Sequence, residues 1–177
     1  MLFRSSMDEQ LLRKLCAEGL SYRYPTLNDE IVERIEKEIA LIAQKDYLSY
    51  FLIAWDFTAY ARSRGFFYVG RGSGANSIVA YLLRITDVDP LELDLYFERF
   101  INLYRKNPPD FDIDFSWKDR DEVVRYIFEK YPHAAWLCTY NTFQFKATVR
   151  ELGKVFGLPK TEIDKLSKRK DRKSTRL

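Results

Sequence analysis

The segment Pro109-Asp110-Phe111-Asp112-Ile113-Asp114-Phe115 alternates strictly between acidic and apolar residues. A period of two is typical of a β-strand, in which residues i, i+2 and i+4 point to one face. The pattern therefore predicts a strand over 110–115, with three aspartates on one face and three apolar side chains on the core. Neighbouring acids on that face are roughly 7 Å apart at their Cα atoms, which is unfavourable unless a cation lies between them.

Hard divalent cations such as Mg²⁺ prefer carboxylate oxygens as ligands. Two carboxylates that bridge two such ions form a recurring arrangement for in-line phosphoryl transfer. We therefore expect this acidic face to bind metal. The alternative is a solvated strand edge, although an ordinary exposed face would also contain Thr, Lys or Arg.

A second motif, the glycine-rich segment 70–77, reads Gly-Arg-Gly-Ser-Gly-Ala-Asn-Ser and follows the apolar run 66–69, which predicts a buried strand. Glycines let the backbone approach an anion closely, and the helix predicted over 77–83 would direct free N–H groups at it. Arg71 would add charge, while Ser73 and Ser77 would add hydroxyl donors. The segment has neither P-loop nor dinucleotide-fingerprint spacing. It is a candidate phosphate cradle, with a plain turn and a capping serine as the alternative.

Hydrophobic periodicity predicts further helices over 8–20, 47–64, 91–100, 119–131 and 142–156, and one that Asn28 caps and that includes Ile31, Ile35, Ile39 and Ile42. Another strand is expected over 134–139, and a turn over 86–90 in which Asp87 and Asp89 act as caps. The predicted fold class is α+β, with a helical N-terminal part and a small sheet.

Composition is that of a folded protein, with 46% hydrophobic and 16% aromatic residues among 177. No apolar run is long enough to span a membrane, and the first residues are too polar and too few for a signal peptide, so a cytoplasmic protein is expected. Two cysteines are far apart and lack metal-ligand spacing. The net charge of +3 is too small to argue for nucleic acid by itself.

Four basic residues outside the glycine-rich segment could contact phosphates. Arg99 and Arg105 lie between that segment and the acidic strand, where they could bind a triphosphate or a template backbone. Alternatively, Arg99 pairs with Glu98 or Asp94 on the surface. Lys146 and Arg150 are one turn apart on a predicted helix, a basic face that fits a solvated surface and a phosphate-tracking surface equally well.

The C-terminal segment 171–177, Asp-Arg-Lys-Ser-Thr-Arg-Leu, resembles the in-frame translation of a common sequencing-adapter sequence. We expect it to be a non-native tail and leave it out of the fold prediction.

Taken in order, these motifs resemble the C-family replicative polymerases, the alpha (catalytic) subunit of bacterial DNA polymerase III. The resemblance runs from Leu11 to Leu166. Besides the glycine-rich segment and the acidic strand, it is carried by Tyr50-Phe51-Leu52-Ile53, Ile85-Thr86-Asp87-Val88-Asp89-Pro90-Leu91, Phe97-Glu98-Arg99-Phe100, Arg120-Asp121-Glu122-Val123 and Arg150-Glu151-Leu152-Gly153-Lys154-Val155-Phe156-Gly157.

The resemblance implies a polymerase beta-like nucleotidyltransferase palm over 1–140, continuing into the start of a thumb over 141–170. It implies template-directed DNA synthesis from deoxynucleoside triphosphates on primer-template DNA, with two Mg²⁺ ions, for which Mn²⁺ could substitute. By position, Asp110 and Asp112 would be the catalytic metal ligands, and Gly72 and Ser73 would contact phosphates. Asp114 matches the third acid of the motif, which the family does not usually count as catalytic. Arg99 and Arg105 match basic positions near the triphosphate.

The resemblance is incomplete in several places. Val69, Asn76 and the segment 103–105 stand where the family usually has proline, glycine and Pro-Glu-Arg. The family's third catalytic aspartate, its N-terminal histidine-rich domain, its fingers and the regions that bind replicase subunits such as the sliding clamp fall outside this sequence. We therefore expect a bacterial, nucleoid-associated polymerase fragment that is inactive alone and does not contact a membrane.

Two other functions stay open. One is another nucleotidyltransferase of the beta superfamily, which would add nucleotides without a template. The other is a non-catalytic metal- or nucleotide-binding module in which the acids and the glycine-rich segment are structural.

Overall fold

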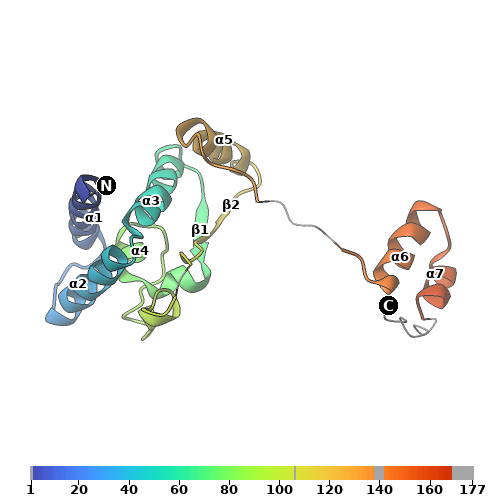
Figure 1. Cartoon of the computed structure of the whole chain (residues 1–177), viewed down its shortest axis with the longest axis horizontal. Helices are drawn as coiled ribbons and strands as arrows, with labels where there is room; N and C mark the ends of the chain where they lie inside the picture. The colour runs from blue at the N-terminus through green and yellow to red at the C-terminus, as the bar shows by residue number, and fades with distance from the viewer. Residues whose placement is uncertain (1, 106, 138–141, 169–177) are drawn as a thin grey trace. The chain divides into compact units, whose positions relative to one another are not determined.

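The computed structural model describes residues 2–105, 107–137 and 142–168. The chain divides into two compact units, Met1–Ala134 and Ala135–Leu177 (Figure 1).

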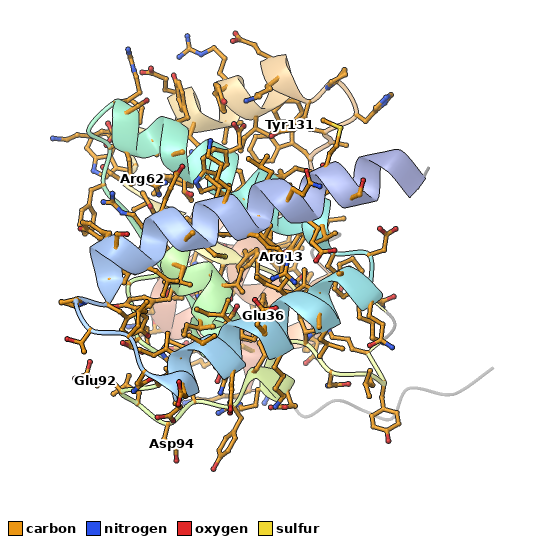
Figure 2. The ribbon with its side chains drawn as sticks, turned by 90° about the vertical axis from the view of Figure 1, so that its left-hand side faces the viewer. Arg13, Glu36, Arg62, Glu92, Asp94 and Tyr131 are labelled. Carbon is orange, nitrogen blue, oxygen red and sulfur yellow. The ribbon has the colours of Figure 1, made fainter. Side chains whose placement is uncertain are left out.

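The first unit begins with three long helices, α1 (Leu2–Arg23), α2 (Asp29–Gln44) and α3 (Leu48–Ser63). Asn28 caps α2 as predicted, because its side chain accepts a hydrogen bond from the amide of Ile31. Helix α1 packs against α2, α3 and the short helix α4 (Ile78–Leu82). Figure 2 shows α1 and α2 side by side, with Arg13 and Glu36 directed toward one another; a guanidinium nitrogen of Arg13 is 2.8 Å from a carboxylate oxygen of Glu36.

The sheet has two antiparallel strands, β1 (Tyr68–Arg71) and β2 (Asp112–Phe115). Strand β1 begins two residues later than predicted and includes Gly70 and Arg71, which pair with Ile113 and Asp112. Gly70 permits this extension, because a Cβ at that position would lie 2.0 Å from the carbonyl oxygen of Ile85. The strands predicted over 66–69 and 110–115 are confirmed in existence and shifted in their limits. The prediction that the first of them is buried is wrong, because Phe67 and Val69 are 72% and 45% exposed and only Gly70 of β1 is buried. The observed mixture of helices with a small sheet agrees with the predicted α+β class.

The core of the first unit lies between these helices and the inner face of the sheet. Its largest fully buried side chains are Leu12, Ile39, Ile42, Leu48, Phe51, Ile78, Leu82, Leu83, Ile85, Phe97, Phe100 and Ile101. The isoleucine stripe predicted for α2 is buried along its whole length. Helix α5 (Arg120–Lys130) packs on α3, where the rings of Tyr60 and Tyr126 stack with centroids 3.9 Å apart.

The prediction of a helix over 91–100 is wrong. Turns occupy this stretch up to the 3₁₀ turn η2 (Phe97–Arg99). The Asp89 carboxylate accepts the amide of Leu91, the amide of Leu95 bonds to the carbonyl of Pro90, and Asp94 has a φ of +49°. These local bonds and the left-handed residue compete with a continuous helix. Asp89 therefore acts as a cap, as predicted, whereas Asp87 pairs with Arg23 at 2.5 Å.

The prediction of a strand over 134–139 is also wrong for 134–137, the part that the structure describes. Residues 134–137 form no strand, and the amide of Ala134 closes a turn onto the carbonyl of Tyr131. Residues 138 and 139 lie outside the described residues.

The second unit contains a helical hairpin of α6 (Phe145–Val155) and α7 (Lys160–Ser167). Gly157, with a φ of +68°, follows the end of α6 as predicted, and the amide of Leu158 bonds back to the carbonyl of Gly153. Gly153 also lets the helices approach, because a Cβ there would lie 2.7 Å from Cγ1 of Ile163. Helix α7 was not predicted. The expected non-native tail, 171–177, lies outside the described residues, and none of the described helices is both long and apolar enough to cross a lipid bilayer.

Candidate functional site

The acidic residues of the segment 109–115 lie at an exposed edge of the first unit. Asp110, Asp112 and Asp114 are exposed, while Phe111, Ile113 and Phe115 are partly buried, as the alternation predicts. Only Asp112 and Asp114 belong to β2, because the hydrogen-bonded strand begins at Asp112. Asp110 lies in the segment that leads into the strand.

Phe111 anchors this strand to the core. Its ring stacks on Tyr50 at 5.2 Å between centroids and meets Phe51 at 5.1 Å and Phe100 at 5.0 Å. Its amide donates a 2.8 Å hydrogen bond to the Tyr50 hydroxyl. The start of the acidic strand is therefore fixed both by aromatic packing and by a polar contact.

The pKa of the Tyr50 hydroxyl responds to several charged residues of the candidate site. Burial raises the pKa of this hydroxyl, and the hydrogen bond from Phe111 opposes the increase. The negative charges of Asp110 and Asp112 raise this pKa further, while the positive charge of Arg105 lowers it. Arg105 thus acts electrostatically on the same hydroxyl as the two acids.

The glycine-rich segment meets the acidic strand directly at Gly72. Pairing of β1 with β2 places Arg71 opposite Asp112, and the next residues form the 3₁₀ turn η1 (Gly72–Asn76). Gly72 has a φ of +71°, and a Cβ there would lie 2.5 Å from Oδ2 of Asp112. Only glycine combines this backbone conformation with so close an approach of the carboxylate. The two motifs that sequence analysis singled out therefore form one site.

Arg71 offsets the negative charge of the acidic face. Its Nε is 2.6 Å from Oδ2 of Asp114, and its Nη1 is 3.8 Å from Oδ2 of Asp112. The bond to Asp114 raises the pKa of the Arg71 guanidinium. All three side chains are about half exposed or more, so water screens this pairing and Arg71 is free to exchange its partners.

The helix that follows the glycine-rich segment does not offer its N-terminus to a ligand, which corrects one part of the predicted phosphate cradle. Glu38 of α2 is fully buried and accepts hydrogen bonds from the amides of Ile78 and Val79. Ser77 is also fully buried, and its hydroxyl donates to Glu38 at 2.7 Å. A carboxylate of the protein itself thus takes the position that a phosphate would occupy. Within the predicted cradle, Arg71 and Gly72 are exposed, while Ser73 and Ala75 are partly buried.

The two predicted arginines differ in their surroundings. The guanidinium of Arg105 donates to the carbonyl oxygens of Phe100 and Asn107 at 3.0 and 3.2 Å, which holds this side chain in place. Arg99 is exposed in η2, and within the described residues it forms no side-chain hydrogen bond or ion pair. The alternative surface pair with Glu98 is not formed either, because Glu98 pairs with Lys37 at 2.6 Å.

Carboxylate oxygens of Asp110 and Asp112 suit a hard divalent cation such as Mg²⁺. Asp112 is half exposed and the neighbouring Gly72 has no side chain, so a cation can reach its oxygens. Across the described parts of the chain, no three His, Cys, Asp or Glu side chains gather into a metal-binding cluster. Asp110 and Asp112 would thus supply two carboxylate ligands to such an ion, and other groups would complete its coordination.

In the second unit, Lys146 and Arg150 are both exposed and one turn apart on α6. The predicted basic face exists there as a local feature of that unit.

Sequence reasoning missed Tyr50, Arg34 and Glu38 as parts of the site. Glu38 could have been noticed, because it falls within the apolar stripe of α2, next to Ile39. A carboxylate on a buried helix face needs partners. The sequence alone could not show that its partners are Ser77 and the two amides that follow.

Comparison with known proteins identifies the family of this chain. A family profile described as the bacterial DNA polymerase III alpha NTPase domain matches residues 10–176. The chain is 47% identical over 160 residues to an error-prone DNA polymerase from Symbiobacterium thermophilum, a match that covers 89% of this chain and 15% of that protein. Similar proteins from Anaeromyxobacter sp. (strain K) and Vibrio campbellii, also called error-prone DNA polymerase, are 43% and 44% identical. Those matches cover 89% and 86% of this chain, and 14% and 15% of the relatives.

Proposed function

This chain belongs to the bacterial DNA polymerase III alpha family, and we propose that its first unit forms part of the nucleotidyl-transfer site of a DNA-directed DNA polymerase. The proposal rests on the contact between Gly72 and Asp112. This contact brings a candidate phosphate-binding turn and a candidate metal-binding strand together. In this proposal, residues 1–140 correspond to a polymerase beta-like palm and 141–170 to the start of a thumb.

The proposed reaction joins the 3′-hydroxyl oxygen of a primer to the α-phosphorus of a deoxynucleoside triphosphate. The bond between that phosphorus and the bridging oxygen breaks, pyrophosphate leaves, and the hydroxyl proton passes to solvent. Asp110 and Asp112 would hold two divalent cations, Mg²⁺ or Mn²⁺. When bound, these ions would neutralise the charge of the phosphates and lower the pKa of the attacking hydroxyl.

The other residues of the site would bind and orient the substrate. The exposed Gly72 and the partly buried Ser73 can approach phosphate oxygens closely with their backbone, since Gly72 has no side chain. Arg71 can transfer from the acids to the triphosphate, because its present ion pairs are solvent-screened. Arg105 is held in place by the carbonyl oxygens of Phe100 and Asn107 and would add positive charge beside the same phosphates.

Primer-template DNA is the proposed macromolecular partner. Arg99 is exposed, and Lys146 and Arg150 form an exposed basic pair on α6, so all three can contact backbone phosphates. The chain spans about 15% of the length of the relatives that it matches, and the proposed activity is that of a whole polymerase.

The experiment is to substitute Asp112→Asn in a chimaera. In the chimaera, this chain replaces the matching segment of the Symbiobacterium thermophilum polymerase. Asparagine keeps the size of the side chain and removes its charge, so primer extension should fall to background while primer-template binding stays unchanged. Asp114→Asn is the matched control on the same strand, and it should retain most of the activity.

Mn²⁺ binding to the 177-residue chain tests the same assignment without catalysis. The chain should bind Mn²⁺, and Asp112→Asn should weaken that binding much more than Asp114→Asn does. Retention of extension and of Mn²⁺ affinity in the Asp112→Asn variant would contradict the proposal. A chain that binds nucleotide but supports no templated extension in the chimaera would favour a non-catalytic binding module or an untemplated nucleotidyltransferase.

A further inference from the structure

A buried ion pair on α2 is connected to the proposed triphosphate-binding turn, and the proposed function does not use it. Glu38, with no exposed surface, accepts four hydrogen bonds, one of them from Nε of Arg34 at 2.7 Å. The others come from the Ser77 hydroxyl at 2.7 Å and the amides of Ile78 and Val79 at 3.2 and 3.3 Å. Since every partner is a donor, both oxygens of Glu38 act as acceptors, as in a carboxylate.

Arg34 extends this connection toward the glycine-rich segment. Its Nη2 donates to the carbonyl oxygen of Asn76 at 3.1 Å and to that of Leu95 at 2.9 Å. Its side chain is 17% exposed, so these bonds are largely protected from water. One planar guanidinium thus links α2, the end of η1 and the segment that leads to η2.

Asn76 completes the link to the proposed binding residues. Its backbone oxygen accepts the bond from Arg34, and its side-chain Nδ2 donates to the carbonyl oxygen of Ser73 at 2.9 Å. Asn76 is 6% exposed, and its Oδ1 is buried without a hydrogen-bond partner in the described structure. The contacts therefore run without interruption from Glu38 through Arg34 and Asn76 to Ser73.

The turn is consequently fixed at both ends. At its first residue, Gly72 lies against Asp112, and the preceding Arg71 is paired with Asp112 in the sheet. At its last residue, Asn76 is held by Arg34, and the following Ser77 is held by Glu38. Two fixed ends separated by a few residues leave the backbone between them little freedom.

We propose that Arg34 and Glu38 are positioning residues. They hold the backbone of Gly72 and Ser73 in a fixed position beside Asp112, where it can bind the triphosphate of an incoming nucleotide. This inference rests on the proposed function of the site. In this proposal neither residue contacts the substrate: Glu38 is fully buried, and Arg34, whose side chain is 17% exposed, is bonded to Glu38 and to two carbonyl oxygens. Their effect passes through Asn76 and Ser77 to the turn. It concerns nucleotide binding rather than metal binding, because the hydrogen bonds of this ion pair within the described residues lead to η1, Ser77, α4 and the segment before η2, and none leads to β2.

The test uses Arg34→Lys in the 177-residue chain. Lysine can keep the charge beside Glu38, but it lacks the planar fork that reaches the carbonyls of Asn76 and Leu95. Two separate affinities are measured by titration calorimetry: Mn²⁺ alone, and dATP with Mg²⁺. We expect dATP affinity to fall by about tenfold, the size of effect that loss of one or two hydrogen bonds from a charged donor produces. Affinity for Mn²⁺ should change by less than about twofold.

A second variant and a control separate positioning from general destabilisation. Asn76→Ala removes the bond to Ser73 without changing Arg34, and it should weaken dATP binding in the same direction. Lys37→Gln is the matched control on the same helix, where an exposed ion pair with Glu98 is lost. It should leave both affinities unchanged.

The outcomes are distinguishable. Wild-type dATP affinity in both Arg34→Lys and Asn76→Ala would overturn the positioning role and leave the proposed function intact. Parallel losses of Mn²⁺ and dATP affinity would also overturn it, because they would indicate a purely structural effect. Absence of dATP binding in the unsubstituted chain would instead contradict the proposed function on which this inference rests.

Discussion

The close contact between Gly72 and Asp112 makes Gly72→Ala the most informative single substitution. Gly72 has a φ of +71°, and a Cβ at this position would lie 2.5 Å from Oδ2 of Asp112. Two separate effects follow. The left-handed backbone costs an alanine about 1–2 kcal/mol in stability. In addition, the Asp112 oxygen must retreat by about 1 Å to restore an ordinary van der Waals contact.

This displacement of the Asp112 oxygen should lower the affinity of the site for Mn²⁺. Mg²⁺ and Mn²⁺ require carboxylate oxygens at short, well-defined distances, and displacing a ligand or the groups that orient it typically costs about 10–100-fold in metal affinity. The expected result for Gly72→Ala is therefore a stability loss of about 1–2 kcal/mol together with at least about tenfold weaker Mn²⁺ binding. Stability is measured by urea denaturation, and Mn²⁺ affinity by electron paramagnetic resonance of the free ion.

Gly65 provides a matched control in the same unit. Its φ is +72°, and a Cβ there would have no heavy atom within 4 Å. Gly65→Ala should therefore show the same loss of stability with unchanged Mn²⁺ affinity. Equal Mn²⁺ affinity in the two variants would refute the argument that Gly72 makes room for the Asp112 carboxylate. Unchanged stability in both would refute the argument from backbone conformation.

Two further predictions concern groups beside the site. Tyr50→Phe removes the hydroxyl that accepts a hydrogen bond from the Phe111 amide, so the free energy of unfolding should fall by about 1 kcal/mol and Mn²⁺ binding should weaken. Urea denaturation measures the first effect and titration calorimetry the second. An unchanged Mn²⁺ affinity would count against a role for Tyr50 in placing the acids. The bond from Lys37 lowers the pKa of Glu98 below its ordinary value of 4.5. The contribution of this carboxylate to stability is therefore present above pH 4.5 and is lost as pH falls through the folded-state pKa. The stability difference between wild type and Glu98→Gln, followed by urea denaturation at several pH values, should therefore be constant at neutral pH and shrink below pH 4.5, and a difference that grows toward acid would reverse the sign of this argument.

The acidic strand could be predicted from sequence because its two faces differ in every residue. Strict alternation leaves no other regular structure for Phe111, Ile113 and Phe115, and the structure places these three toward the core. The α2 helix was predictable for the same reason, since its isoleucines recur at helical spacing.

The segment 91–100 shows where periodicity fails. Leu91, Leu95 and the buried Phe97 and Phe100 have helical spacing, but Asp89 and Pro90 bind the backbone locally before a helix can form. A side chain that captures nearby amides competes with the helix, and apolar spacing does not reveal which one wins. Helix α7 was missed for a different reason: it buries little more than Ile163 and Ser167, so its pattern is weak.

The candidate site was predictable in its components but not in its assembly. Sequence identified the acids, the glycine-rich turn and Arg105, because each carries a local chemical signature. It could not show that β1 extends to Arg71, and this extension is what brings Gly72 to Asp112. Nor could it show that Glu38 would occupy the amides after Ser77, because that contact joins residues 40 positions apart.

The occupied start of α4 changes how phosphate recognition at this site should be understood. In many phosphate-binding loops, a helix N-terminus supplies both free amides and a positive dipole. Here the buried carboxylate of Glu38 already takes those amides, so the dipole stabilises a part of the protein itself. Attraction for a triphosphate would then have to come from bound cations at Asp110 and Asp112, from Arg71 and from Arg105. On this view, the turn contributes shape, and Gly72 contributes mainly by leaving room for the carboxylate that holds the cation. Nucleotide affinity should consequently depend on divalent metal to a greater degree than in sites where a helix N-terminus faces the phosphate.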